Sequence, residues 1–146
     1  MRLNLQTDYA LRLLMHLAVH KDGPATIAEV ADRYSISKNH LMKVANALGR
    51  EGLIDTERGR SGGLRIAPDG LDVRVGDVVR LMEADMALVE CFEGGKGECL
   101  ITPACRLKGV LKDAVDAFLG VLDQYTVKDL VNRNVKLRAL LGGRAA

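Results

Sequence analysis

Two short helical segments joined by a tight turn, between residues 26 and 50, constrain the fold of this chain more than any other feature. Thr26 followed three residues later by Glu29 is a capping-box pattern, which begins the first segment. Ser37 is placed to cap the second segment after a turn of two residues. Together with an earlier segment of helical periodicity, the pattern predicts three helices, the last two forming a helix-turn-helix. The predicted helices cover residues 7–20, 27–34 and 38–50.

A hairpin is predicted directly after these helices. Leu53–Thr56 and Leu64–Ile66 are plausible strands, and the residues between them are basic and rich in glycine. Net charge over the whole chain is only +2, but residues 36–65 hold six basic residues against three acidic ones. A helix-turn-helix followed by a basic hairpin is the order of a winged helix. Residues 1–70 are therefore predicted to bind double-stranded operator DNA.

The start of the 38–50 helix should enter the major groove, where its early residues reach base edges. Lysine there reads guanine or phosphate, and asparagine pairs with adenine. Arginines on the hairpin tip suit phosphates or a narrow minor groove. A surface histidine with no role in DNA binding is an equal alternative for His40. The predicted DNA-binding residues are Ser37, Lys38, Asn39, His40, Lys43, Arg58 and Arg60.

All three cysteines of the chain lie close together, at Cys91, Cys99 and Cys105. Glycines make the first interval flexible, so that the chain can fold around a small object. Thr102 and Pro103 favour a helix start that would place Cys105 in the first turn, where the helix dipole favours a thiolate. Neighbouring charged residues are mostly acidic. A metal centre would relieve the resulting repulsion.

The spacing of the cysteines does not identify the metal. Three thiolates leave a tetrahedral ion one ligand short, and the intervals match neither the common zinc signatures nor ferredoxin spacing. An iron–sulfur cluster, a zinc ion and a metal-free thiol switch therefore stay open. For a cluster, both the 4Fe–4S and the 2Fe–2S form are compatible with three cysteines.

Residues 103–124 carry apolar side chains at spacings of three and four, which predicts the longest helix of the chain. A helix this long in a small protein favours pairing with its twin, hence a homodimer. A shorter helix is predicted over residues 75–84. Another follows Thr126 and ends near Asn134, after which the tail to Ala146 is expected to fray.

The predicted fold class is mainly α with a small β wing, in which a winged helix-turn-helix domain precedes a long dimerisation helix. Hydrophobic residues make up 48% of the chain but aromatic residues only 3%, which favours helices packed with Leu, Val and Ala. The predicted organisation is a winged helix-turn-helix domain at 1–70, a linking helix with the cluster-binding loop at 71–102, and a dimerisation helix with a short C-terminal helix and tail at 103–146.

Several functional classes are excluded by absent patterns. No apolar run reaches the ~18 residues that span a membrane, and no export signal is present, so we expect a cytoplasmic protein. In that reducing compartment cysteines serve as metal ligands or redox thiols rather than disulfides. No phosphate-binding glycine loop, nucleophile elbow or His-Glu zinc motif occurs, which argues against an enzyme.

Five stretches of the chain carry a family resemblance: Thr7–Arg12, Ser37–Val44, Arg58–Gly63, Cys99–Lys108 and Leu122–Thr126. Through them the chain resembles the NsrR family of nitric-oxide-sensing repressors, which is related to the iron–sulfur regulator IscR. The likeness extends over residues 1–134. IscR-like members carry a histidine ligand shortly after the third cysteine, whereas Arg106, Leu107 and Lys108 follow it here. The IscR branch is therefore the less favoured one.

The resemblance implies that Cys91, Cys99 and Cys105 hold an iron–sulfur cluster, with Asp8 of the partner subunit as a fourth ligand. Without the family, Asp8 is better explained as a carboxylate favoured by a helix N-terminus. The implied function is a repressor that releases its operator when nitric oxide reacts with the cluster. The alternatives are an IscR-like regulator of iron–sulfur assembly and a metal-free repressor that senses through thiols.

Overall fold

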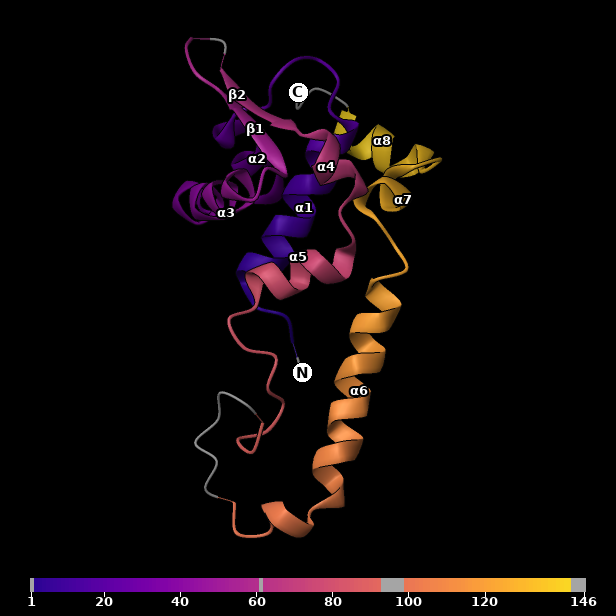
Figure 1. Cartoon of the computed structure of the whole chain (residues 1–146). Coiled ribbons are helices and arrows are strands. Elements are labelled where there is room, and N and C mark those ends of the chain that lie inside the picture. Colours follow the sequence, from indigo (N-terminus) through magenta and orange to yellow (C-terminus); the bar gives the residue numbers. More distant parts are fainter. Residues whose placement is uncertain (1, 61, 93–98, 143–146) are drawn as a thin grey trace.

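The computed structural model describes residues 2–60, 62–92 and 99–142. Figure 1 shows a cluster of helices with a small sheet, from which one long helix extends. Residues 83–92 lead away from the cluster, residues 99–105 lie at the far end of the long helix, and that helix returns to the cluster. The elements are α1 (Leu5–Val19), α2 (Ile27–Tyr34), α3 (Lys38–Arg50), β1 (Ile54–Glu57), β2 (Gly63–Ile66), α4 (Pro68–Asp72), α5 (Val75–Met82), the 3-10 helix η1 (Thr102–Ala104), α6 (Arg106–Leu122), α7 (Val127–Val131) and α8 (Val135–Gly142).

The helix-turn-helix forms where the sequence predicts it. Thr26 and Glu29 make both bonds of the capping box, at 3.1 Å from the Glu29 N–H to the Thr26 hydroxyl and 2.8 Å from the Thr26 N–H to the Glu29 carboxylate. Ser35 adopts a left-handed conformation with φ of 54°, which turns the chain from α2 into α3. Ser37 occupies the N-cap position of α3, but its side chain makes no capping hydrogen bond, so the predicted cap is wrong.

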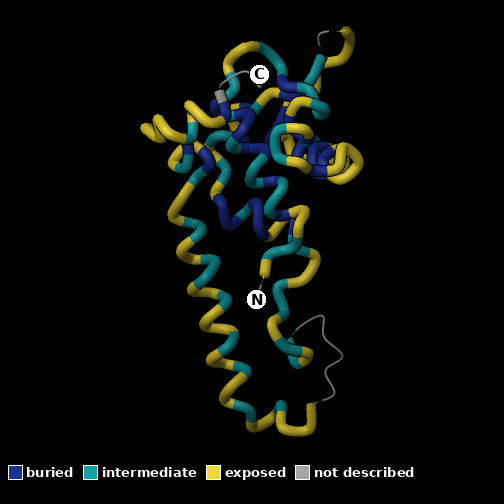
Figure 2. Tube along the Cα trace, turned by 180° about the vertical axis from the view of Figure 1, so that it is seen from behind, coloured by how far each residue is buried: buried dark blue, intermediate teal, exposed yellow. Residues whose placement is uncertain are grey.

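Helix α1 lies at the centre of the hydrophobic core. It contacts α3, α5, α7, α8 and β2, so every other part of the helix cluster packs on it directly or through one neighbour. Figure 2 shows that buried residues gather in this cluster, whereas no residue of α6 is buried. The predicted mainly helical fold with a two-stranded wing is confirmed. The core includes Ala10, Leu13, Leu14, Leu17, Val30, Leu41, Val44, Leu48, Val78 and Val127.

The hairpin is antiparallel and pairs Ile54 with Ile66 at its base. It is held against the α1–α2 connection, because Ala25 and Leu64 exchange two backbone hydrogen bonds of 2.9 and 2.8 Å. Gly63 is required here, since a Cβ would lie 2.6 Å from the Ala25 carbonyl oxygen. The strands begin and end within one residue of the predicted bounds. Pro68 begins the short helix α4, an element that the sequence pattern does not predict.

Two predictions for the C-terminal half need correction. The long helix begins at Arg106, because Thr102–Ala104 form a separate 3-10 turn, and Cys105 with ψ of 106° is the N-cap rather than part of the first turn. The tail was expected to fray, yet residues 135–142 form α8, whose Leu141 packs with Val19 and Val131. Residues 143–146 lie outside the described part. Nowhere in the described stretches is a helix long and apolar enough to cross a bilayer.

Glu83, at the C-terminal end of α5, joins that helix to the start of α1. Its carboxylate accepts from the Asn4 N–H at 2.9 Å and from the Thr7 hydroxyl at 2.6 Å. Asn4 also donates from its side chain to the Met82 carbonyl at 3.0 Å, and it caps α1 by accepting from the Thr7 N–H. Because Thr7 is fully buried, its hydroxyl has no access to water in place of Glu83.

Replacing Glu83 with alanine should destabilise the fold. The variant leaves a buried hydroxyl and a backbone N–H without their acceptor, which costs about 1–3 kcal/mol of unfolding free energy. Urea denaturation followed by circular dichroism measures the loss. Glu51→Ala is the matched control, because it removes the same side chain from an exposed position. Equal stability of the two variants would contradict the role of Glu83.

His16 is a buried histidine in α1, between the His20 and Tyr34 rings. Its pKa is lowered from 6.5 to about 4, chiefly by burial and further by the positive charges of His20 and Arg33, against an opposing effect of Glu29. The unfolded chain therefore binds a proton near pH 6 that the folded chain does not. Stability from this group is present above pH 6.5 and is lost as the pH falls towards 4.

Acidification from pH 7.5 to pH 5 should therefore cost about 2 kcal/mol of unfolding free energy through His16 alone. Urea denaturation at the two pH values measures the total change, to which other groups also contribute. His16→Gln removes the titration while keeping a polar side chain, so its loss over the same interval should be smaller by about that amount. An identical loss in both proteins would show that His16 titrates alike in the folded and unfolded states.

Candidate DNA-binding surface and cysteine-lined cavity

The outer face of α3 gathers the residues predicted to contact DNA. The inner face of the helix is buried through Leu41, Val44, Ala45 and Leu48. Because those positions recur every three or four residues, the opposite side of the helix faces solvent, while Ala47 at the margin packs partly against the core. The fold thus presents the predicted set on one helical surface. The exposed residues at the start of this surface are Ser37, Lys38, Asn39, His40 and Lys43.

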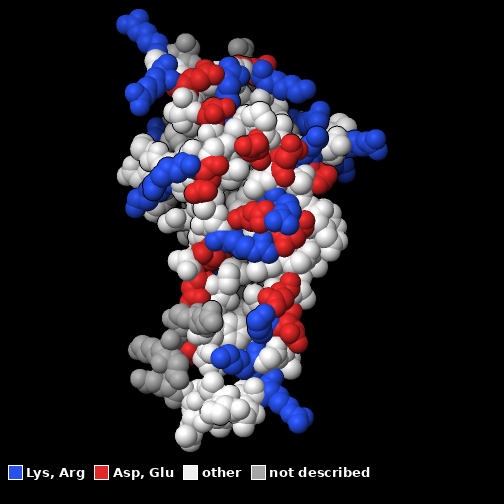
Figure 3. Space-filling model, viewed as in Figure 1, with Lys and Arg blue, Asp and Glu red and all other residues white. Residues whose placement is uncertain are grey.

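The hairpin tip carries the other predicted contacts. Arg58 and Arg60 are both exposed there, and Figure 3 shows Lys and Arg side chains at the tip and over α3. Gly59 has φ of 113°, a conformation that favours glycine and lets the chain reverse at the tip. Unlike these two arginines, Arg65 forms an ion pair with Glu57 on the neighbouring strand. The tip therefore offers two guanidinium groups beyond the paired part of the hairpin.

The three cysteines line one cavity of about 410 Å³ beside the start of α6. All are free thiols, with Cys91 and Cys105 half-buried and Cys99 exposed. The backbone of η1 ties the last two together, because the Thr102 N–H donates to the Cys99 carbonyl at 3.1 Å and the Cys105 N–H donates to the Thr102 carbonyl at 3.3 Å. The other lining residues are Val89, Glu90, Ile101, Leu107, Lys108 and Leu111.

The donor set of this cavity fits a sulfur-ligated iron centre better than a hard cation. Thiolates are soft ligands, and mostly apolar walls are the surroundings that tune iron–sulfur centres. Within residues 2–60, 62–92 and 99–142, no group of three or more His, Cys, Asp or Glu side chains is close enough together to hold a metal ion. The cysteines therefore share a cavity without converging on one point. Residues 93–98, between Cys91 and Cys99, lie outside the described part.

Asp8 does not line the cysteine cavity of its own chain. It lies in the first turn of α1, and its carboxylate binds Arg12 through two contacts, 2.9 Å to Nε and 2.7 Å to Nη2. Both side chains are 41% exposed, so this pair is accessible from solvent. A metal-binding role for Asp8 would need a second subunit and a rearranged pair with Arg12.

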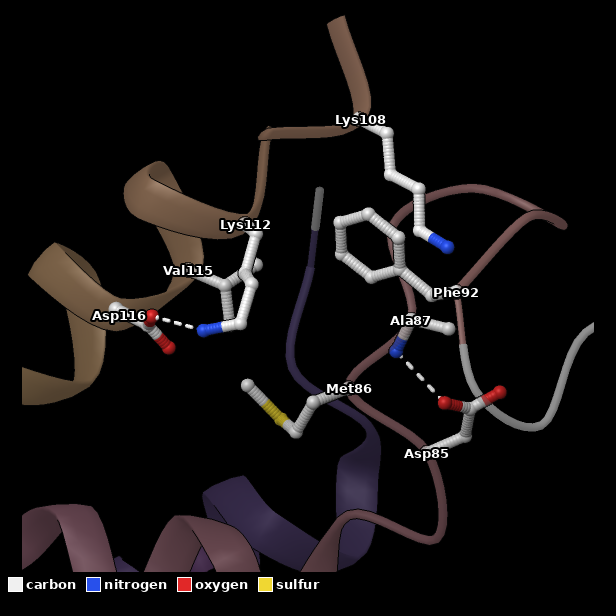
Figure 4. Close-up of a pocket in the computed structure, with 8 residues that line it drawn as sticks. All are labelled: Asp85, Met86, Ala87, Phe92, Lys108, Lys112, Val115 and Asp116. Atoms are coloured by element: carbon white, nitrogen blue, oxygen red, sulfur yellow. Dashed lines mark hydrogen bonds and ion pairs between the residues drawn. The ribbon is translucent and has the colours of Figure 1, made fainter. Parts of the chain in front are cut away.

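A second cavity of about 350 Å³ adjoins the first, between residues 85–92 and α6. Figure 4 shows Phe92 and Met86 from the loop opposite Lys108 and Lys112 from the helix. Lys112 pairs with Asp116 at 2.5 Å, one turn further along α6. Lys108 lines both cavities, so it stands between the cysteines and this second hollow.

These features define a class: a winged-helix protein with an exposed recognition helix, a basic hairpin tip and a cysteine-lined cavity. The family model described as "Rrf2: Iron-dependent Transcriptional regulator" matches residues 3–133. The chain belongs to the Rrf2 family. It is a transcriptional regulator and not an enzyme.

Curated relatives and solved structures agree with this assignment. The HTH-type transcriptional regulator NsrR of Shouchella clausii is 51% identical over 142 residues, covering 97% of this chain and 95% of that one. NsrR of Bacillus subtilis is 48% identical, covering 97% of both. The structure of CymR, the global cysteine regulator of B. subtilis, is 27% identical with a TM-score of 0.68, covering 90% of this chain and 96% of that one. IscR of T. potens, at 23% identity and a TM-score of 0.72 over 93% and 90% of the two chains, shares the fold. The predicted resemblance to NsrR is confirmed.

Sequence reasoning missed part of the cavity wall. Lys108 and Leu111 line the cysteine cavity, whereas the sequence pattern places Leu111 in the apolar stripe of residues 103–124 and predicts no cavity there. The signal in the sequence is the spacing of three residues from Cys105 to Lys108 and again from Lys108 to Leu111. Side chains three residues apart are neighbours on a helix surface, so each of these residues lies next to the preceding one.

Proposed function

We propose that this chain is a transcriptional repressor that holds an iron–sulfur cluster on Cys91, Cys99 and Cys105 and releases its operator in response to nitric oxide. The observation that carries the proposal is the single cavity that the three thiols line, in a family described as iron-dependent transcriptional regulators. The resemblance to NsrR supplies the signal. When bound, the cluster provides the iron with which nitric oxide reacts. Either a 4Fe–4S or a 2Fe–2S form is compatible with three cysteine ligands.

The cysteines are placed to act on the dimerisation helix. Cys105 is the N-cap of α6, and the η1 turn connects it to Cys99 through backbone hydrogen bonds. Thiolates held at fixed positions would fix this turn and therefore the start of α6. Released thiolates would leave the turn without that constraint. Cys91 lies at the other end of the segment that connects α5 to α6. That segment begins after Glu83, whose carboxylate accepts a hydrogen bond from Thr7 in α1.

Asp8 of the partner subunit is the proposed fourth ligand. A carboxylate is a weaker partner for iron than a thiolate, so it is the ligand that a small molecule displaces most easily. Its position in the first turn of α1 would connect the cluster to the core of the DNA-binding domain. Arg12 would keep a counter-charge beside this carboxylate when it leaves the iron, as it does in the single chain.

A second copy of the chain is the proposed cover for α6. The helix has 17 residues, none of them buried, and Leu107, Val110 and Val121 expose 60%, 62% and 55% of their surfaces. Such a stripe is stabilised when it packs against its symmetry-related twin. A homodimer would place two α3 helices on half-sites about 34 Å apart, one turn of the duplex.

Contacts with the operator would divide between α3 and the wing. Asn39 and His40 at the start of α3 would face base edges, and Lys38 and Lys43 would bind guanine or phosphate. Arg58 and Arg60 would reach the neighbouring phosphates or minor groove. Ser37, at the N-cap, lies close enough to the first turn to donate to a phosphate.

Breaking the α6 stripe should separate the dimer. Val110→Glu places a charge at the most exposed of the three positions, and burying that charge against the twin helix is costly. We expect the dimer dissociation constant to rise at least about tenfold, and operator binding to weaken with it. Analytical ultracentrifugation measures the first quantity. Gly120→Glu adds the same charge to α6 where a side chain would have open space, and it should stay dimeric. A dimeric Val110→Glu variant would contradict the interface.

Removing one cysteine should remove both the cluster and repression. Cys99→Ala, purified without oxygen, is expected to lose most of its iron and acid-labile sulfide and to bind the operator at least about tenfold more weakly. For the wild-type protein loaded with its cluster, nitric oxide should cause a similar loss in a fluorescence anisotropy titration. Unchanged iron content in Cys99→Ala would exclude the cysteine-held cluster.

The same experiment separates the rival functions. An IscR-like regulator of iron–sulfur assembly would keep its operator affinity in nitric oxide and respond to iron starvation. A thiol sensor would be colourless as purified without oxygen and would still bind DNA, responding to an oxidant through the exposed Cys99. A zinc protein would contain zinc without sulfide.

A further inference from the structure

Met42 is the one apolar side chain on an otherwise polar surface of α3. It is 48% exposed and takes no part in the hydrophobic core that holds the inner face of the helix. Its neighbours along the outer face are Asn39 three residues before and Asn46 four residues after, so the three side chains form one stripe. The other exposed residues of α3 are all polar or charged: Lys38, Asn39, His40, Lys43, Asn46 and Arg50.

Packing within the chain gives no reason for methionine at this position. Single exposed apolar side chains are common on protein surfaces and need no explanation by themselves. Met42 is unlike such scattered residues because of its position. It lies between two amide side chains and beside Lys43, on the face of α3 that carries the predicted DNA contacts. An apolar residue on that face would meet whatever apolar group the ligand offers.

The major groove of DNA offers one such group, the 5-methyl of thymine. Asparagine is suited to the adenine N6 and N7 edge. Side chains three residues apart on a helix have Cβ atoms about 5–6 Å apart, and base pairs are stacked about 3.4 Å apart. Asn39 and Met42 would therefore reach the same or neighbouring base pairs.

We propose that Met42 is a specificity-determining residue that packs against the 5-methyl group of a thymine in each operator half-site, next to an adenine read by Asn39. The inference rests on the proposed placement of α3 in the major groove. An unbranched thioether suits this task, because methionine adapts its shape to an apolar neighbour without requiring a hydrogen bond. The contact selects thymine over cytosine and over uracil.

Replacing thymine with deoxyuridine tests the contact, because it removes the methyl group and leaves base pairing intact. A duplex selected from random sequences by the wild-type protein is synthesised with a single deoxyuridine at each thymine in turn, at symmetry-related positions. Loss of one buried methyl should weaken wild-type binding roughly fourfold per half-site at one position. Met42→Ala should bind the thymine and deoxyuridine duplexes with equal affinity at that position.

Lys43→Ala is the matched control on the adjacent position of α3. It should weaken binding to both duplexes by the same factor and reduce the salt dependence, because a lysine contact is electrostatic. Met42→Ala should keep the wild-type salt dependence. Both variants change exposed residues, so thermal unfolding by circular dichroism should be unaltered.

Two outcomes overturn the inference and are distinguishable. If Lys43→Ala weakens binding while Met42→Ala keeps the wild-type preference for thymine at every position, α3 lies on the DNA but Met42 does not read the methyl group. If Lys43→Ala has no effect and the wild-type protein shows no preference for thymine anywhere, the proposed placement of α3 fails as well.

Discussion

The packing of α1 in the core is the constraint on which the rest of this structure depends. Leu13 and Leu14 are fully buried, and the helix contacts α3, α5, α7 and α8. Because cores are close-packed, α1 and the recognition helix cannot shift independently by more than side-chain rearrangement allows. A displacement of the N-terminal turn of α1 would therefore also displace α3, whose outer surface is proposed to face DNA. Glu83 is bonded to that turn and is the last residue before the cysteine-containing segment.

The second half of the molecule has the opposite character. Helix α6 buries none of its residues, and the cysteines line an open cavity rather than a closed site. An exposed apolar stripe is costly in water, and exposed thiols are reactive. Each feature therefore favours a binding partner that a single chain does not supply. Under the proposed function the stripe is covered by a second chain and the thiols by a cluster.

The features that the sequence predicted well are those with local causes. The capping box at Thr26 and Glu29 and the periodicity of α3 involve residues within one or two turns, so the two helices occur at the predicted bounds. Helix α8 escaped prediction because its stability depends on Leu141 reaching Val19, a contact between distant parts of the chain. The start of α6 was misplaced for a different, local reason, because Thr102–Ala104 form a separate 3-10 turn whose Thr102 N–H donates to the Cys99 carbonyl.

For the site, spacing predicted that the cysteines act together but not what surrounds them. Helical spacing after Cys105 makes Lys108 and Leu111 neighbours on α6, but the direction in which α6 leaves Cys105 decides which cavity they line, and only the fold fixes that direction. The same limit applies to Asp8, because its pairing with Arg12 is a local contact at helical spacing while any contact with iron would depend on a second chain.

Helices α5 and α6, which the cysteine-containing segment connects, are also bonded to each other directly. Arg80 on α5 holds Asp123, just past the end of α6, by two contacts of 2.8 and 2.7 Å. Gly76 is needed there, since a Cβ would lie 1.9 Å from the Asp123 carboxylate. With that end of α6 fixed, a change in the cysteine segment at its other end would tilt the helix about the Arg80–Asp123 contact. In a dimer that pairs through α6, such a tilt would change the separation of the two α3 helices. Binding to two half-sites on a duplex depends on that separation.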